Sequence, residues 1–299
     1  MKLRKVLNSL MIAGAILLLI GAIVFLISFG SMGFNLSAFS YVSVESKTYD
    51  ETGTITELSL AVETANVYYY EAKEGQPLSV RYTRRKNREG ELINDVEIAE
   101  EGGRLILTET ENSEGKVLLL DIADPVIEIY LPTDRTYDVE TNVDVGNVRV
   151  VGNFSAKTVV LSTKNGSIYT EKSTFACDAI ALNAVNGGIY FGTVNADEAT
   201  AAVSNGSVSI NGNITAGSFS ATTKNGQIYY RSSVIDADDV TLSSTNGNVK
   251  AKLRGKPADY TTTLTVEKGR SNVEETATGE RHLRITVQTG SIHIDFEGE

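Results

Sequence analysis

The residues best suited to breaking a bond are three adjacent carboxylate pairs, Asp197-Glu198, Asp238-Asp239 and Glu274-Glu275. Two carboxylates that face each other across a sugar can cleave a glycosidic bond. All three pairs, however, fall where the repeat described below places loops, and solvated charge is ordinary in loops. We interpret them as surface residues and expect no enzyme. A carbohydrate-active β-helix, a lyase or hydrolase acting on surface glycan, stays open as the alternative function.

Histidine and cysteine offer little further chemistry. The chain has two histidines, His282 and His293, and one cysteine, Cys177. A lone cysteine forms no intramolecular disulfide, and these three residues do not supply a zinc ligand set. No Ser-His-Asp order is recognisable. We therefore expect no catalytic residue, no metal and no cofactor, and interpret Cys177 as a small packing residue.

An aromatic column suggests contact instead of catalysis. Tyr169, Tyr190 and Tyr229 each stand three residues after a recurring glycine, where other repeats have Arg149, Ser209 and Lys250. In the strand register given below these positions point outward, with Tyr169 and Tyr190 about 5 Å apart. Exposed tyrosines can stack on sugar rings or pack against a protein, although tyrosine is also a favourable strand residue. We take the three tyrosines as the candidate interaction surface.

An asparagine column precedes the same glycines. Its members are Asn165, Asn186, Asn205, Asn225 and Asn246. These side chains could grip a ligand, but Asn also suits tight corners, and stacked amides can bond to one another. We favour a structural amide ladder.

The glycines themselves define a repeat. Gly146, Gly166, Gly187, Gly206, Gly226, Gly247, Gly269 and Gly290 are spaced by 20, 21, 19, 20, 21, 22 and 21 residues. Apolar residues recur at fixed offsets from each glycine and at intervals of two, which is the strand period. Only the Gly269 repeat departs, with Ser271 where the others have Val or Ile. Each repeat therefore predicts one strand, an Asn-Gly corner and a second strand.

Stacking of these repeats explains the constant spacing of both strands. We predict an all-β fold, a β-solenoid of the right-handed parallel β-helix type with coils of about 20 residues. A meander or sandwich is the alternative. Residues 132–299 form the regular part, and residues 55–131 an irregular, membrane-proximal start to the same body. Leu182, Ile189 and Ile228 should be buried.

The N-terminus predicts a membrane anchor. Residues 6–29 carry no charge and are long enough to cross a bilayer, while Lys2, Arg4 and Lys5 precede them. The positive-inside rule places residues 1–5 in the cytoplasm and the body outside the cell membrane. Residues 30–54 would be a juxtamembrane linker. A cleaved signal peptide is the alternative, and it exports the body as well.

Charge limits the partners of the exported body. The whole chain has a net charge of −11, and residues 30–299 hold 24 basic and 38 acidic residues, a net of −14. Such a body repels phosphate backbones, so we expect no nucleic-acid partner. The expected partners are the lipid bilayer, through residues 6–29, and an envelope protein or glycan.

Several phrases carry a family resemblance. The run Pro125-Val-Ile-Glu-Ile-Tyr-Leu-Pro132, then Tyr137-Asp-Val-Glu-Thr141, then repeated Asn-Gly, resembles the β-strand-repeat family DUF4097, the putative adhesins. It also resembles the LiaG-type and YvlB-type membrane-associated proteins of Gram-positive bacteria. The resemblance covers roughly residues 55–296 and implies a β-solenoid, an envelope location and links to adhesion or envelope stress. It provides no catalytic residues. The sequence thus predicts a non-catalytic, membrane-anchored envelope protein that serves interaction or scaffolding.

Overall fold

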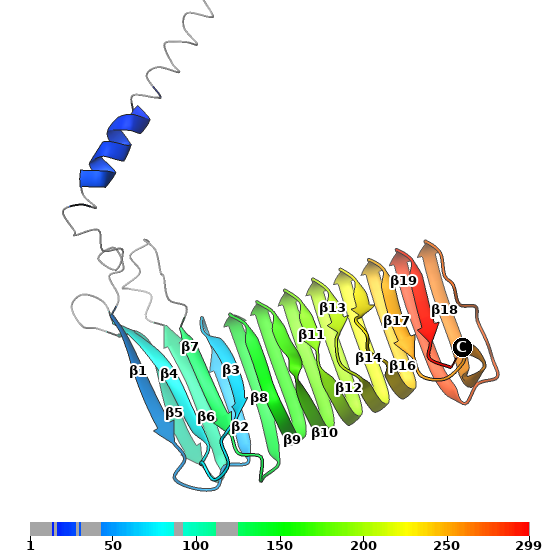
Figure 1. Cartoon of the computed structure of the whole chain (residues 1–299), viewed down its shortest axis with the longest axis horizontal. Coiled ribbons are helices and arrows are strands. Elements are labelled where there is room, and N and C mark those ends of the chain that lie inside the picture. The colour runs from blue at the N-terminus through cyan, green and yellow to red at the C-terminus, as the bar shows by residue number, and fades with distance from the viewer. Residues whose placement is uncertain are drawn as a thin grey trace, which may run out of the picture.

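The computed structural model describes residues 14, 17–27, 30, 43–86, 92–111 and 125–298. Its described strands join in one 20-stranded sheet and lie side by side along an elongated body (Figure 1). The all-β prediction is confirmed.

Twenty strands and one short 3-10 helix make up this body. The N-terminal strands are β1 (Ser43–Asp50), β2 (Glu57–Val62), β3 (Asn66–Glu71), β4 (Ser79–Lys86), β5 (Leu92–Glu101), β6 (Arg104–Glu111) and β7 (Val126–Leu131). The central strands are β8 (Tyr137–Val145), β9 (Val148–Asn165), β10 (Ile168–Asn186), β11 (Ile189–Phe191), β12 (Thr193–Asn205), β13 (Val208–Ile210), β14 (Ile214–Asn225), β15 (Ile228–Tyr230), β16 (Ile235–Asn246) and β17 (Val249–Leu253). The last elements are η3 (Pro257–Asp259), β18 (Tyr260–Lys268), β19 (Arg281–Thr289) and β20 (Ile292–Phe296).

Successive repeats pair in parallel on both sides of the Asn-Gly corner. We call the strand segments before the corner ladder A and those after it ladder B. Ladder A contains Asn165 opposite Asn186 and Asn186 opposite Asn205, so equivalent residues adjoin as predicted. Ladder B pairs β10 with β11, β11 with β13, and β13 with β15 in the same way. A third, short ladder of parallel pairs completes each repeat. In this ladder, for example, Phe175 lies opposite Phe154 on one side and Val194 on the other.

The core is the set of inward columns of these ladders. Leu182, Ile189 and Ile228 are all 0% exposed, which confirms the predicted register. Phenylalanines of the core also meet across repeats: the rings of Phe191 and Phe219 pack edge to face, with centroids 6.0 Å apart. Because each inward side chain packs on its equivalents above and below, the core extends through the whole body.

The spatial order of the last two repeats reverses their order in sequence. Strand β19 pairs with β16 on one side and with β18 on the other. The repeat that contains Gly290 therefore lies inside the one that contains Gly269, which corrects the expectation that coils stack in sequence order. The more apolar repeat occupies the inner place: Ile285 is fully buried, whereas Leu264, its register partner on β18, is only partly buried.

The same exchange occurs at the other end. Strand β2 pairs in parallel with β6 and with β8, so the repeat formed by β2 and β3 lies between the β6–β7 repeat and the regular ones. Antiparallel strands then cover the sheet edges, β5 on β6 and β4 on β7, with β1 on β4. Covering an edge in this way removes a template for unwanted strand pairing.

Strand β1 lies in the segment that the sequence analysis assigns to a linker. It has no buried side chain among those described, and Val44 is exposed, so no inward column marked it in the sequence. Glu45 bridges it to β4 through Lys86 Nζ at 3.1 Å and also pairs with Lys47. Backbone pairing with β4 forms this strand, and partly buried Tyr49 packs against the core. The sequence also predicts a strand over residues 117–122, which lie outside the described residues.

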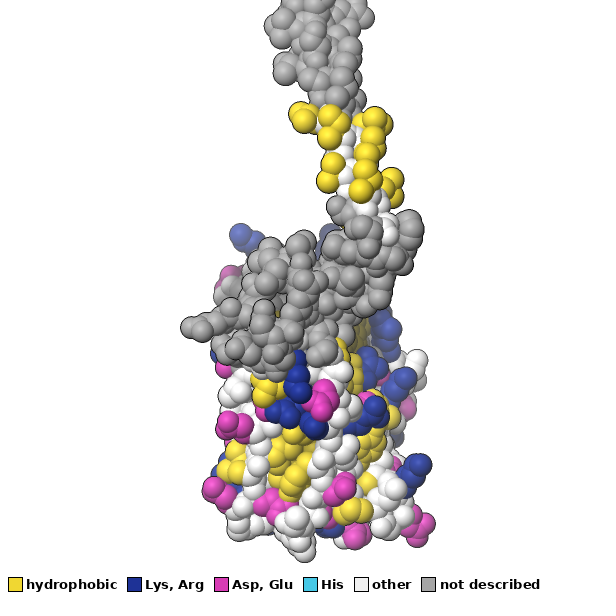
Figure 2. Space-filling model, turned by 90° about the vertical axis from the view of Figure 1, so that its left-hand side faces the viewer, with side chains coloured by type: hydrophobic (Ala, Val, Ile, Leu, Met, Phe, Trp, Pro, Cys, Tyr) yellow, Lys and Arg dark blue, Asp and Glu magenta, His cyan; other side chains and the backbone are white. Residues whose placement is uncertain are grey.

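Residues 17–27 are helical, and their large apolar side chains are exposed (Figure 2). The predicted span over residues 6–29 also includes residues outside the described set. Within the described part of the chain, no helix has both the length and the apolar character needed to cross a bilayer.

The register makes a direct prediction about stability. Changing Ile189, which is fully buried, to Ala should lower the free energy of unfolding by about 2–5 kcal/mol. Changing its neighbour Tyr190 to Ala should cost clearly less, because this ring lies on the outer face. Denaturant unfolding of both variants measures the difference, and a larger loss from the Tyr190 change would mean that the faces are assigned the wrong way round.

Candidate interaction surface

The three predicted tyrosines lie on the outer face of ladder B. Tyr169 is opposite Tyr190, Tyr190 is opposite Ser209, and Ser209 is opposite Tyr229. The rings of Tyr169 and Tyr190 stack, with centroids 4.8 Å apart and planes 8° apart. The spacing of the rings equals that of neighbouring strands, so the backbone register sets the ring stack. We call this outer column the tyrosine row.

Ser209 interrupts the aromatic rings but not the surface. It is only 1% exposed although its side chain is small, so larger neighbours cover it. Its hydroxyl donates to Asn211 Oδ1 at 2.7 Å, which leaves it satisfied in that position. Tyr190 and Tyr229 flank it on the adjoining strands, so the outer surface has no gap between the two rings.

Cations accompany the rings. The Arg149 guanidinium lies over the ring of Tyr169, 4.7 Å from its centroid, and Arg231 lies 5.6 Å from the centroid of Tyr229. A guanidinium over a ring face is attracted by the negative face of the π system. The row therefore has aromatic and cationic groups side by side, a combination suited to binding and not to bond cleavage.

The row continues past the residues found from the sequence. Tyr68 on β3 lies in the same column, opposite Arg149 on one side and Glu128 of β7 on the other. Tyr70, two residues further along β3 and so beside the column, stacks with Tyr130 of β7 at a centroid distance of 5.3 Å. Alignment of the repeats on their corner glycines missed Tyr68 and Tyr70, because this repeat has Ala65 where the regular repeats have glycine. Tyr130 lies on the neighbouring strand β7. Val67, which pairs with Val148, is the signal that would have placed Tyr68 in the column.

Burial keeps the phenol of Tyr190, and those of Tyr70 and Tyr130 beside the row, neutral at physiological pH. Burial raises the pKa of Tyr190, and the neighbouring Tyr169 and Tyr229 raise it further. Burial likewise raises the pKa of Tyr70 and of Tyr130, with Glu128 adding to the effect. Neutral phenols act as hydrogen-bonding, ring-stacking surfaces and are poor nucleophiles.

The asparagine column forms the predicted structural ladder. Each amide nitrogen donates to the side-chain oxygen of the preceding repeat at 2.9 Å, in the pairs Asn186–Asn165, Asn205–Asn186, Asn225–Asn205 and Asn246–Asn225. These amides satisfy one another along the corner, as stacked Asn side chains do in other parallel sheets.

The carboxylate pairs lie on exposed positions. Asp197, Glu198, Asp238 and Asp239 are all exposed, as expected of surface residues. The expectation that they lie in loops is wrong, because the first pair lies within β12 and the second within β16. Glu274 and Glu275 are exposed as well, between β18 and β19, and Glu275 accepts from the backbone N–H of Leu264 at 3.2 Å. Among the residues that the structure describes, no group of three or more His, Cys, Asp and Glu side chains could hold a metal ion.

The structure also places the two histidines and the cysteine. His293 Nε2 lies 3.1 Å from an Asp295 oxygen, and His282 is exposed on β19. Cys177 packs against the core, and burial raises the pKa of its thiol to about 11. It is therefore protonated at neutral pH and suits the predicted packing role.

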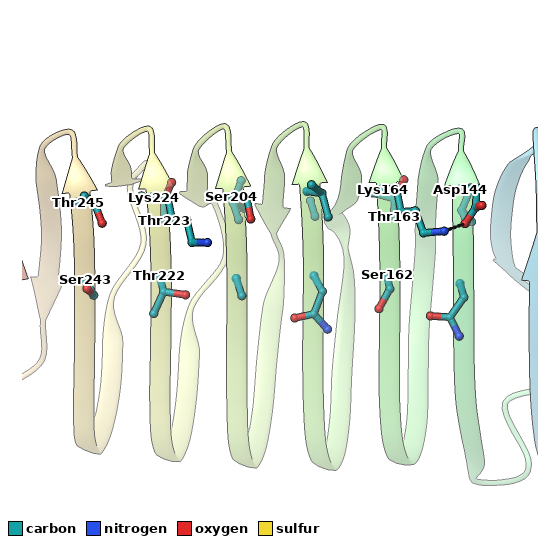
Figure 3. Close-up of a pocket in the computed structure, with 17 residues that line it drawn as sticks. Asp144, Ser162, Thr163, Lys164, Ser204, Thr222, Thr223, Lys224, Ser243 and Thr245 are labelled. Atoms are coloured by element: carbon teal, nitrogen blue, oxygen red, sulfur yellow. Dashed lines mark ion pairs between the residues drawn. The ribbon is translucent and has the colours of Figure 1, made fainter.

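A shallow groove of about 500 Å³ lies elsewhere, on the outer face of ladder A (Figure 3). Its outward side chains are mainly small, and they include Asn142, Ser162, Asn183, Thr222 and Ser243. Lys164 Nζ pairs with Asp144 Oδ1 at 2.7 Å at its rim. The groove has neither aromatic rings nor clustered charges, so the tyrosine row offers the richer recognition chemistry.

Stacked parallel repeats with a structural amide ladder and an aromatic outer column define a repeat protein of the all-β class. The family model Toastrack DUF4097 matches residues 55–297, and the chain belongs to this family. No curated protein matches the sequence.

The solved structures that resemble this chain include three bacterial proteins. A putative adhesin from Bacteroides fragilis is 14% identical, with a TM-score of 0.46 over 84% of this chain and 97% of that chain. A putative lipid binding protein from Parabacteroides distasonis is also 14% identical, with a TM-score of 0.47 over 86% of this chain and 95% of that one. A putative cell adhesion protein from Clostridium sporogenes is 12% identical, with a TM-score of 0.27 over 86% of this chain and 100% of that chain.

The amide ladder predicts a structural effect without a binding effect. Asn205 donates one ladder bond and accepts another, so Asn205→Ala should lower the free energy of unfolding by about 1–2 kcal/mol. Asn195→Ala is the control, because Asn195 is exposed and its side chain makes no hydrogen bond within the described structure. Thermal and denaturant unfolding compare the two. Equal stability of both variants would remove the ladder as a source of stability.

Proposed function

We propose that the chain is a non-catalytic, membrane-anchored protein of the cell envelope that uses the tyrosine row for binding. In this proposal the body is a β-solenoid of the right-handed parallel β-helix type, held outside the cell. The observation that carries the proposal is the stacked pair Tyr169 and Tyr190 with Arg149 over one ring. Adhesion and a part in envelope stress, which the family resemblance implies, would both use such a surface.

Binding suits the row better than catalysis does. Aromatic rings fixed on a rigid sheet offer a large contact area at small cost in side-chain entropy. The exposed acid pairs lie away from the row, and His293, which follows Lys250 in the same column, pairs with Asp295 and has no nucleophile beside it in the described chain. No observation on the described residues favours the alternative of a glycan lyase or hydrolase.

Anchoring is proposed from the N-terminal sequence and the exposed helix. The basic residues lie before the apolar stretch, and the large apolar side chains of residues 17–27 are exposed, as a lipid contact requires. The acidic body is repelled by anionic lipid heads and would extend away from the bilayer.

Thiol labelling tests this topology. With Cys177 changed to Ser, a single cysteine introduced at Glu280, which is exposed, should react with an impermeant reagent on intact cells. Quantifying the label before and after lysis makes the measurement. Labelling that appears only after lysis would place the body in the cytoplasm and reject the proposal.

Removal of the rings tests the function. Tyr169, Tyr190 and Tyr229 changed together to Ser should leave the fold nearly intact and weaken binding of the purified protein to isolated envelope fractions, measured by co-sedimentation. The control is a triple change to Ala at Thr200, Thr222 and Thr241, which lie on the outer face of ladder A and make no side-chain hydrogen bond within the described structure. Unchanged binding by the tyrosine variant would leave the rings as ordinary strand surface.

A further inference from the structure

The cations beside the tyrosine row lack acidic partners. Arg149, Arg231, Lys250 and Lys252 take part in none of the ion pairs found among the described residues, although residues 30–299 carry a net charge of −14. The acids near them are few. Glu128 lies opposite Tyr68 and pairs with Arg81, and Glu171 lies near Tyr190. Asp295 is engaged by His293 and by the Tyr230 hydroxyl, which donates to it. The row is thus a locally cationic face on an acidic body.

Arg231 is held beside two rings. Its guanidinium lies 5.6 Å from the Tyr229 centroid, and its charge is close enough to act on the Tyr190 phenol. The side chain itself is exposed. A free guanidinium next to ring faces can bind a carboxylate or phosphate with two parallel hydrogen bonds while a sugar ring packs on the aromatic surface.

The backbone around Arg231 is fixed. Its N–H donates to the Ile210 carbonyl at 2.8 Å, and the Ser233 hydroxyl donates to the same carbonyl at 2.7 Å. Between them Ser232 has φ 54°, the one positive φ of a non-glycine residue in the described chain. Such conformations persist where the surroundings impose them and are frequent at binding sites. The turn thus presents Arg231 in a set position.

We propose that Arg231, together with Tyr190 and Tyr229, binds an acidic glycan whose sugar rings carry carboxylate or phosphate groups. The inference rests on the proposed function and adds the class of ligand. Free cations also lie further along the face, Arg149 on one side and Lys250 on the other, so a chain that follows the row meets several of them. A nucleic acid, with a charge on every phosphate, would be repelled more strongly by the acidic body than a glycan with sparser charge.

Titration of the full chain in detergent with polymers of known charge tests the inference. The probes are a polyuronate, the same polymer with its carboxyls methyl-esterified, and a phosphorylated mannan, with binding measured calorimetrically. We expect at least one acidic polymer to bind more tightly than the ester. Arg231→Gln should weaken that binding about tenfold, Arg231→Lys less, and neither should change binding of the ester. Arg284→Gln is the control, because Arg284 is exposed on ladder A and has no ion pair among the described residues.

Three outcomes overturn the inference. Equal affinity for the acid and the ester, with no effect of Arg231→Gln, would mean that the row recognises uncharged rings. Failure of both acidic polymers to bind would exclude the ligand class. Tighter, Arg231-dependent binding of a single-stranded oligonucleotide would assign the site to nucleic acid. The proposed function stands in the first two cases if the triple tyrosine variant still loses envelope binding, and it falls only if that variant binds like the control.

Discussion

The close approach of one corner glycine to the next is the constraint on which the structure depends. A Cβ atom added at Gly187 would lie 1.7 Å from the carbonyl oxygen of Gly166, and one at Gly206 would lie 1.9 Å from that of Gly187. Both glycines also have φ near +150°, a conformation that other residues rarely adopt. At these corners only glycine allows stacking at strand spacing, and the asparagine amides then bond beside them.

The stacking of the corners also sets the register of the side chains on the outer surface. Because each corner is fixed on its neighbour, the residue three positions later also lies over its equivalent, whatever its side chain. This places Tyr169 on Tyr190 as a stack and brings Tyr68 alongside Arg149. The strand register that buries Ile189 therefore also fixes the positions of the rings beside it. No further stabilising interaction is needed to make this surface rigid.

The features that repeat along the sequence could be predicted, and the features that occur once were missed. Glycine spacing and apolar columns were enough for the all-β class, the buried residues and the tyrosines of the regular repeats. The exchanged order of β18 and β19 was not predictable, because both strands carry columns that fit the same neighbour. Strand β1 forms mainly by backbone pairing and has no fully buried side chain among those described. The turn at Ser232 that presents Arg231 has no sequence signal that we recognised.

Site-specific photo-crosslinking on intact cells tests the central claim, that the tyrosine row is the surface that meets the envelope, most directly. A benzophenone amino acid at position 190, which keeps an aromatic ring in the row, should give crosslinked envelope material, and the same amino acid at Thr222 on ladder A should not. Crosslinking from Thr222 alone, or equally from both positions, would contradict the account and move the binding surface away from the row.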